Sequence, residues 1–211
     1  MNNPPLPGET SIRDFLTAVA SVHEAHGAVS AAAVAGALGS SLLVMVAALP
    51  PMRSDVIADR TMLMDATTAL SDIREQLIET IETETAVRIF AARNMPQASE
   101  TERHARQAAI QFALRAAADV PLEVMRLCAR GLRYAETVAT HSPRPKSTDV
   151  QLAVALLHAA FSGARSNLEM RLSSLTATGY IASVIDEIAR LSDDAATAAR
   201  AAESASQVPP A

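Results

Sequence analysis

The spacing of apolar and polar positions predicts a chain built almost entirely of helices. Ile12, Phe15, Leu16 and Val19 recur at helical spacing behind a Thr-Ser start, with the acidic Asp14 nearby. Longer helical patterns of the same kind cover residues 54–94, 100–140, 149–175 and 180–203. No stretch keeps the alternation of a strand. We therefore expect an all-α fold, a bundle of about six mostly long helices. It would form a single domain over residues 11–203, between a flexible arm at 1–10 and a flexible tail at 204–211.

Residues 27–49 form an uncharged run that allows two interpretations. Its 23 residues are long enough to span a bilayer. However, most are Ala, Gly and Ser, and small residues recur in four-residue steps at Ala28, Ala32, Gly36 and Ser40. Such lines let two helix backbones approach closely, in membranes or in soluble bundles. The rest of the chain has no comparable segment and no basic flank marks this one, so we favour a central helix buried on all sides.

Local signals predict where the helices begin and end. Ser99 has Glu102 at the offset of a capping box, which predicts a helix start there. Pro121 lies inside the next helical pattern and should kink or divide it. Residues 140–149 form the clearest loop, and the break between the last two helices is expected near Gly179.

Composition and charge narrow the class of protein. The chain is 49% hydrophobic but 3% aromatic, with no Trp, so its core should consist of aliphatic side chains. A net charge of −5 argues against a nucleic-acid partner, which would require a basic patch. Cys128 is the single cysteine, so neither an internal disulfide nor a zinc knuckle is available, and a small core residue is expected there. The first residues lack the pattern of a secretory signal, and we expect a cytoplasmic protein without a membrane partner.

Four segments, in this order, carry a resemblance to a known family. They are "SIRDFLTAVAS", the helix "SAAAVAGALGSSLLVMVAALP", "AARNMPQASETERHARQAAIQFALRAAADVPLEV" and "STDVQLAVALLHAAFSGARSNLEM". Together they resemble the cyclodeaminase/cyclohydrolase family, which includes methenyltetrahydrofolate cyclohydrolases and the cyclodeaminase domain of formiminotransferase-cyclodeaminase. The resemblance covers roughly residues 11 to 190.

The resemblance implies an all-helical homodimer that acts on a folate-type small molecule. The substrate would be a pterin with a one-carbon unit between N5 and N10, and no cofactor or metal would be required. The reaction would be hydrolysis of the methenyl bridge to a formyl group, or closure of a formimino group with loss of ammonia. The first needs a base for the attacking water and the second an acid for the departing nitrogen, and carboxylates can serve both.

The chain departs from the family pattern at several positions. Where the family has a Pro-Gly-Gly-Gly-Ser turn before the small-residue helix, this chain has His26, Gly27, Ala28, Val29 and Ser30. A turn of glycines allows positive φ, which Val29 tolerates poorly, and a helix start suits an anion such as a folate carboxylate. A lysine-rich segment of the family is reduced to Arg53, and an Asp-rich segment keeps only Glu82. The Asn-Val-x-x-Asn pattern keeps Asn167 but has Arg171 in its second place.

The resemblance assigns roles to the retained residues, and each has a structural alternative. Asp149 and Glu82 would handle protons, but Asp149 also suits a helix start and Glu82 a solvated helix face. Arg53 or Arg106 would meet the acidic tail of the substrate, although Arg106 could simply pair with Glu102 one turn back.

The remaining candidates would contact the substrate. Asn167 would hold the edge of the pterin, although a protein carbonyl could occupy it instead. Gly27 and Ser30 belong to the altered turn. His26 could act there as an acid or base near neutral pH, or be an ordinary loop histidine.

Two functions of different class follow. The first is a folate one-carbon enzyme, with the cyclohydrolase preferred over the cyclodeaminase. The second is a family member that has lost catalysis and acts as a binding or assembly subunit, an interpretation supported by the missing glycines, lysines and second asparagine.

Overall fold

The described part of the chain is entirely helical. The computed structural model describes residues 11–21, 27–49, 57–81, 93–96, 99–142 and 147–207, and for residues 57, 58 and 81 only the backbone. These ranges contain α1 (Ile12–Ala20), α2 (Ala28–Ala47), α3 (Ile57–Ile81), α5 (Glu100–His141), α6 (Ser147–Leu172) and α7 (Thr178–Gln207). The all-α prediction is confirmed. The predicted continuation of α3 over residues 82–92 lies outside the described residues.

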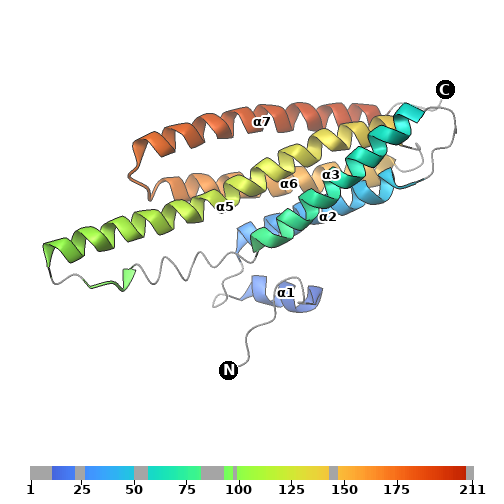
Figure 1. Cartoon of the computed structure of the whole chain (residues 1–211). Coiled ribbons are helices and arrows are strands. Elements are labelled where there is room, and N and C mark those ends of the chain that lie inside the picture. Colours follow the sequence, from blue (N-terminus) through green and yellow to red (C-terminus); the bar gives the residue numbers. More distant parts are fainter. Residues whose placement is uncertain are drawn as a thin grey trace.

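The five long helices pack side by side around one core (Figure 1). α2 packs against α3, α5 and α6, while α7 covers α5 and α6. Contacts between distant residues fix the directions. Gly39 of α2 faces Ala153 of α6 and Gly163 of α6 faces Ala32 of α2, so these two helices are antiparallel.

The capping box predicted at Ser99 is present. Its Oγ accepts a hydrogen bond from the backbone N–H of Glu102 at 3.1 Å, and the Glu102 carboxylate accepts one from the Ser99 N–H at 2.9 Å. Ser11 caps α1 through the Asp14 N–H in the same way. However, the predicted apolar face of α1 is largely open, because Ile12 is 81% and Leu16 61% exposed.

Pro121 does not divide α5, which contradicts part of the prediction. α5 runs unbroken for 42 residues with Pro121 buried inside it. Proline removes one backbone hydrogen bond, but the packing of Ala118, Leu122 and Met125 on both sides of it buries the helix against its neighbours. The break between α6 and α7 falls at residues 173–177, just before the expected position at Gly179.

α2 is the central helix that its small residues predict, but it is not buried on all sides. Gly36 and Gly39 lie against other helices: a Cβ on Gly36 would lie 3.0 Å from Cys128 Sγ, and one on Gly39 2.9 Å from the Ala153 carbonyl oxygen. On the opposite face Leu38 is 53% and Met45 43% exposed. By length and composition α2 could cross a membrane, but the core helix of a soluble protein meets the same two criteria. The small residues explain the asymmetry, because they line the contacts with α3, α5 and α6 and leave larger side chains on the outer face.

Candidate functional site

The start of α2 is an open helix N-terminus. Gly27 is its N-cap residue with φ −110° and ψ −165°, an extended conformation that any residue adopts. No described residue has positive φ, and a Cβ on Gly27 would meet nothing within 4 Å. Neither the backbone conformation nor the surroundings of Gly27 therefore require a glycine at this position. Among the described residues no side chain caps this end and no acidic residue lies in its first turn, so the N–H groups near Ser30 keep their preference for an anion.

Asn167 lies on α6 close to this helix start. Since Gly163 faces Ala32, the next turn of α6 brings Asn167 level with Ala28, the first residue of α2. Asn167 is half-buried, and its Nδ2 donates to the Gly163 carbonyl oxygen at 3.3 Å. The structure thus brings Gly27, Ser30 and Asn167 to one end of the bundle, which we call the glycine end.

Arg171 follows Asn167 by one helical turn. Its Nε is buried and finds no hydrogen-bond partner among the described residues. Burial lowers the pKa of the guanidinium. A cation with a buried, unsatisfied N–H beside an uncapped helix start is suited to an anionic group. In the sequence, Arg171 stands out only as a departure from the family pattern.

Asp149 lies at the opposite end of the bundle. It is half-buried in the first turn of α6, one turn before Ala153, which faces Gly39 near the middle of α2. The same end holds a pair that the sequence analysis missed: His141 Nδ1 lies 2.8 Å from Asp59 Oδ1, and the two side chains are 21% and 39% exposed. A carboxylate beside an imidazole orients it for proton transfer, and it also ties α3 to α5. The two residues are 82 positions apart in sequence, so no local sequence pattern predicts this pair.

The two ends are too far apart to form one site within one chain. Asp149 and Asn167 lie 18 residues apart on the continuous helix α6, which corresponds to about 27 Å at 1.5 Å per residue. Eighteen residues are also five turns, so both side chains project from the same face of α6. A folate ring held by Asn167 is therefore out of reach of Asp149 in the same chain.

Arg106 belongs to neither end. Its Nε donates to the Arg93 carbonyl oxygen at 2.9 Å, so it holds residues 93–96 against α5 and does not pair with Glu102. Thirteen residues of α5, about 20 Å, separate it from Asp119. The candidates His26, Arg53 and Glu82 lie outside the described residues.

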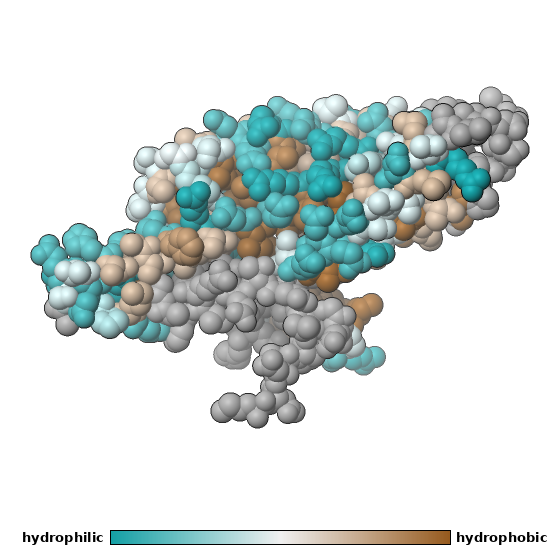
Figure 2. Space-filling view, viewed as in Figure 1, coloured by the Kyte–Doolittle hydropathy of each residue, from teal (hydrophilic) through white to brown (hydrophobic). Residues whose placement is uncertain are grey.

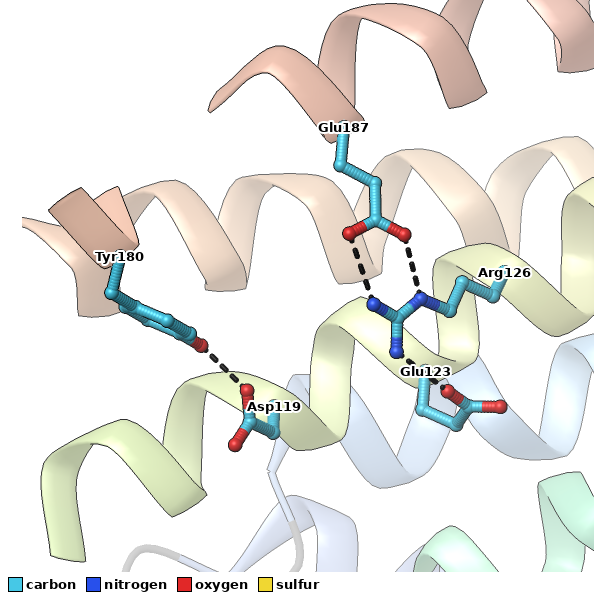
Figure 3. Close-up of polar contacts among 5 residues, drawn as sticks. All are labelled: Asp119, Glu123, Arg126, Tyr180 and Glu187. Atoms are coloured by element: carbon cyan, nitrogen blue, oxygen red, sulfur yellow. Dashed lines mark hydrogen bonds and ion pairs between the residues drawn. The ribbon is translucent and has the colours of Figure 1, made fainter. Parts of the chain in front are cut away.

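A polar cluster joins α5 to α7 near the glycine end (Figure 3). Tyr180 Oη donates to Asp119 at 2.6 Å, and Arg126 holds Glu187 through two hydrogen bonds of 2.8 and 2.9 Å. Arg126 also donates to Glu123 at 3.1 Å. Burial, assisted by Asp119, raises the pKa of Tyr180, while the hydrogen bond from Arg126 lowers the pKa of Glu187. Every charge shown in Figure 3 has a partner, so the cluster is a tie between helices.

A surface groove between α6 and α7 has a volume of about 500 Å³. Leu172, Ile185 and Ile188 line it together with Arg165, which pairs with Glu169 at 2.8 Å. The groove lies on the α7 side of α6, and none of the predicted site residues lines it. It is therefore separate from the candidate site.

Comparisons with known proteins agree with this fold. Residues 11–190 match the family described as formiminotransferase-cyclodeaminase. Over 172 residues the chain is 29% identical to a methenyltetrahydrofolate cyclohydrolase of Methylorubrum extorquens, covering 81% of this chain and 83% of that protein. The crystal structure of a formiminotetrahydrofolate cyclodeaminase from Thermotoga maritima superposes with a TM-score of 0.83 at 20% identity, covering 94% and 96% of the two chains.

The fold is thus that of an all-α folate enzyme. This chain belongs to the formiminotransferase-cyclodeaminase family of folate one-carbon cyclohydrolases and cyclodeaminases.

Proposed function

We propose that this protein hydrolyses 5,10-methenyltetrahydrofolate to 10-formyltetrahydrofolate. The similarity to a methenyltetrahydrofolate cyclohydrolase over four fifths of the chain carries the proposal. The alternative reaction within the family is cyclodeamination of formiminotetrahydrofolate. We also propose that the enzyme is a cytoplasmic homodimer that needs no metal or redox cofactor.

The glycine end provides the elements that a folate requires. The uncapped start of α2 and the buried Nε of Arg171 suit an anionic group such as the glutamate tail of the substrate. Asn167, one turn from Arg171, can present an amide to the pterin edge once its weak 3.3 Å bond to Gly163 is exchanged.

We assign proton transfer to Asp149 of the other copy in the proposed homodimer, because Asp149 and Asn167 of one chain lie at opposite ends of α6. Water attacks the electron-poor methenyl carbon, a base takes its proton, and the bond from that carbon to N5 breaks as N5 is protonated. Asp149, with the His141–Asp59 pair at the same end of the bundle, provides the base and then the acid. Glu82 stays a second candidate for the same task.

The test is the loss of methenyltetrahydrofolate absorbance above the spontaneous rate. Asp149→Asn should lower kcat by about 100-fold or more, because general acid–base catalysis contributes at least that much. Asp14→Asn is the matched control, since Asp14 is also a carboxylate in the first turn of a helix. Folate binding by the purified chain without acceleration of the reaction would favour the binding subunit over the enzyme.

A further inference from the structure

The groove between α6 and α7 is formed by one face of each helix. On α6 it is lined by Arg165, Glu169 and Leu172, which follow one another in steps of four and three residues and so share a face. On α7 it is lined by residues between Ile185 and Asp193 with the same helical spacing. α7 packs more extensively on α5 than on α6, and a volume of about 500 Å³ stays open between α6 and α7. This volume is typical of small-molecule sites.

The groove is polar at one end and apolar at the other. Arg165 lies level with Ser192, because its Nη1 donates to the Ser192 Oγ at 3.4 Å. The two helices are antiparallel (Figure 1), so Leu172 and Ile185 both lie seven residues from this contact, about 10 Å closer to the connection between the helices. The polar end therefore holds Arg165, Ser192 and Asp193, and the apolar end holds Leu172 and Ile185.

The apolar end exposes a large aliphatic side chain to solvent. Ile185 is 53% exposed, whereas the neighbouring Leu172 and Ile188 are 7% and 6% exposed and belong to the core of the bundle. The surface over α3 and α5 is, by contrast, largely hydrophilic (Figure 2). An apolar group that enters the groove thus removes Ile185 from water without opening the core, which is favourable.

The polar end has unused hydrogen-bonding groups of both charges. Arg165 donates through Nε to Glu169 at 2.8 Å and through Nη1 to Ser192. A guanidinium has five N–H groups, so the others stay available. Asp193 is exposed and has no hydrogen-bond or ion-pair partner among the described residues. A cation with free donors therefore lies beside a carboxylate with free acceptors.

We propose that this groove binds an α-amino acid with a large apolar side chain. The carboxylate of the ligand accepts hydrogen bonds from Arg165, and its ammonium group donates to Glu169 and Asp193. Its side chain lies along Ile188 toward Ile185. Because the two ends of the groove are about 10 Å apart, a long side chain such as an aromatic one is needed to reach Ile185. The site is separate from the proposed active site and does not depend on the proposed function.

The charges of the groove select a zwitterion over a ligand with a single charge. Two carboxylates line the groove beside one guanidinium, so a purely anionic ligand meets more repulsion than attraction. A purely cationic ligand leaves the free N–H groups of Arg165 to water. In an α-amino acid both charged groups are attached to one carbon atom. Arg165 and Glu169 present opposite charges at a similarly short separation, 2.8 Å between Nε and Oε1.

Ligand fluorescence tests the site directly, because the chain contains no Trp. L-Tryptophan, tryptamine and indole-3-propionate share the indole ring, but tryptamine lacks the carboxylate and indole-3-propionate lacks the ammonium group. When the protein is titrated to about 1 mM, the anisotropy of L-tryptophan should rise with a Kd at or below that concentration. Each analogue should bind about 10-fold more weakly, because its hydrogen bonds to one charged group are lost. No binding of L-tryptophan, or equal binding of all three compounds, would overturn the proposal.

Substitutions at the surface locate the site. Arg165→Gln and Asp193→Asn should each weaken L-tryptophan binding by about 10-fold. Ala189→Phe should abolish binding, because the ring fills the middle of the groove. Asp194→Asn is the matched control, since this neighbouring carboxylate lies 3.9 Å from Arg133 of α5 and does not line the groove. All four altered side chains are exposed, so the variants should fold. Unchanged affinity in the groove variants, or an equal loss in the control, would contradict the proposal.

Melting temperature gives a second measurement that needs no fluorescence. A ligand that contacts both α6 and α7 binds only the folded chain, so L-tryptophan at about ten times its Kd should raise the melting temperature in calorimetry. Asp194→Asn should show the same rise and Ala189→Phe none. An unchanged melting temperature of the wild type would argue against the site. Neither measurement uses folate or turnover, so failure here leaves the proposed function untouched, and an inactive enzyme leaves this site untouched.

Discussion

At the scale of single residues, protonation of Glu187 affects the stability of the fold. Its hydrogen bonds from Arg126 hold its pKa below the ordinary value, so the folded state binds fewer protons than the unfolded state near pH 4. The resulting stability is present above the pKa of about 4.3 for an unfolded glutamate and is lost as the pH falls through the lower pKa of the folded state.

Glu187→Gln should therefore lower the free energy of unfolding at pH 7 by about 1 kcal/mol, because the partly exposed pair is screened by solvent. Urea unfolding at pH 7 and pH 3 measures this, and the difference between variant and wild type should shrink at pH 3. Asp194→Asn is the control: Asp194 lies 3.9 Å from Arg133 with both side chains more than half exposed. It should change the stability by less than about 0.5 kcal/mol, and an equal loss in both variants would argue against the pair across α5 and α7.

At the scale of the helices, Gly39 sets how closely α2 and α6 approach. A Cβ there would lie 2.9 Å from the Ala153 carbonyl oxygen and 3.0 Å from Leu157 Cγ, and the backbone oxygen cannot move aside alone. Overpacking costs about 1–3 kcal/mol, and the better helix propensity of alanine offsets up to about 1 kcal/mol of it.

Gly39→Ala should accordingly destabilise the fold by about 1–2 kcal/mol in thermal or urea unfolding. Gly179→Ala, in the first turn of α7, meets nothing within 4 Å and should be neutral or slightly stabilising. If the two variants had the same free energy of unfolding, α2 and α6 would be able to move apart without destabilising the fold.

The elements with local signals could be predicted from the sequence, and those set by packing could not. The Ser99 capping box and the start of α1 depend on residues three apart, so the sequence contains the whole interaction. α5 continues unbroken through Pro121, and the outer face of α2 is open. Both features depend on which helices pack alongside, and no local sequence pattern predicts that packing.

The candidate site was predictable only in part, for the same reason. Gly27, Ser30 and Asn167 come together because α2 and α6 are antiparallel. The separation of Asp149 from Asn167 follows from the length of one helix. The His141–Asp59 pair joins two residues 82 positions apart in sequence, so it could be found only from the fold.

For the molecule as a whole, the proposed homodimer makes stability, and any activity that needs both copies, depend on protein concentration. Specific activity and melting temperature should both fall when the protein is diluted below the dissociation constant of the proposed dimer. Activity measured over a dilution series checks this. Specific activity that stays constant down to concentrations where sedimentation finds only monomer would be the opposite result.

The five whole turns of α6 between Asp149 and Asn167 restrict how the length of this helix can vary. Adding or removing one residue between them rotates one side chain about the helix axis by about 100° relative to the other, so the two no longer project from the same face of α6. Changes of about one full turn preserve the direction but shift the spacing by about 5.4 Å, which must then be matched by α2. Insertions and deletions should therefore be tolerated in the connections between helices and excluded from this part of α6.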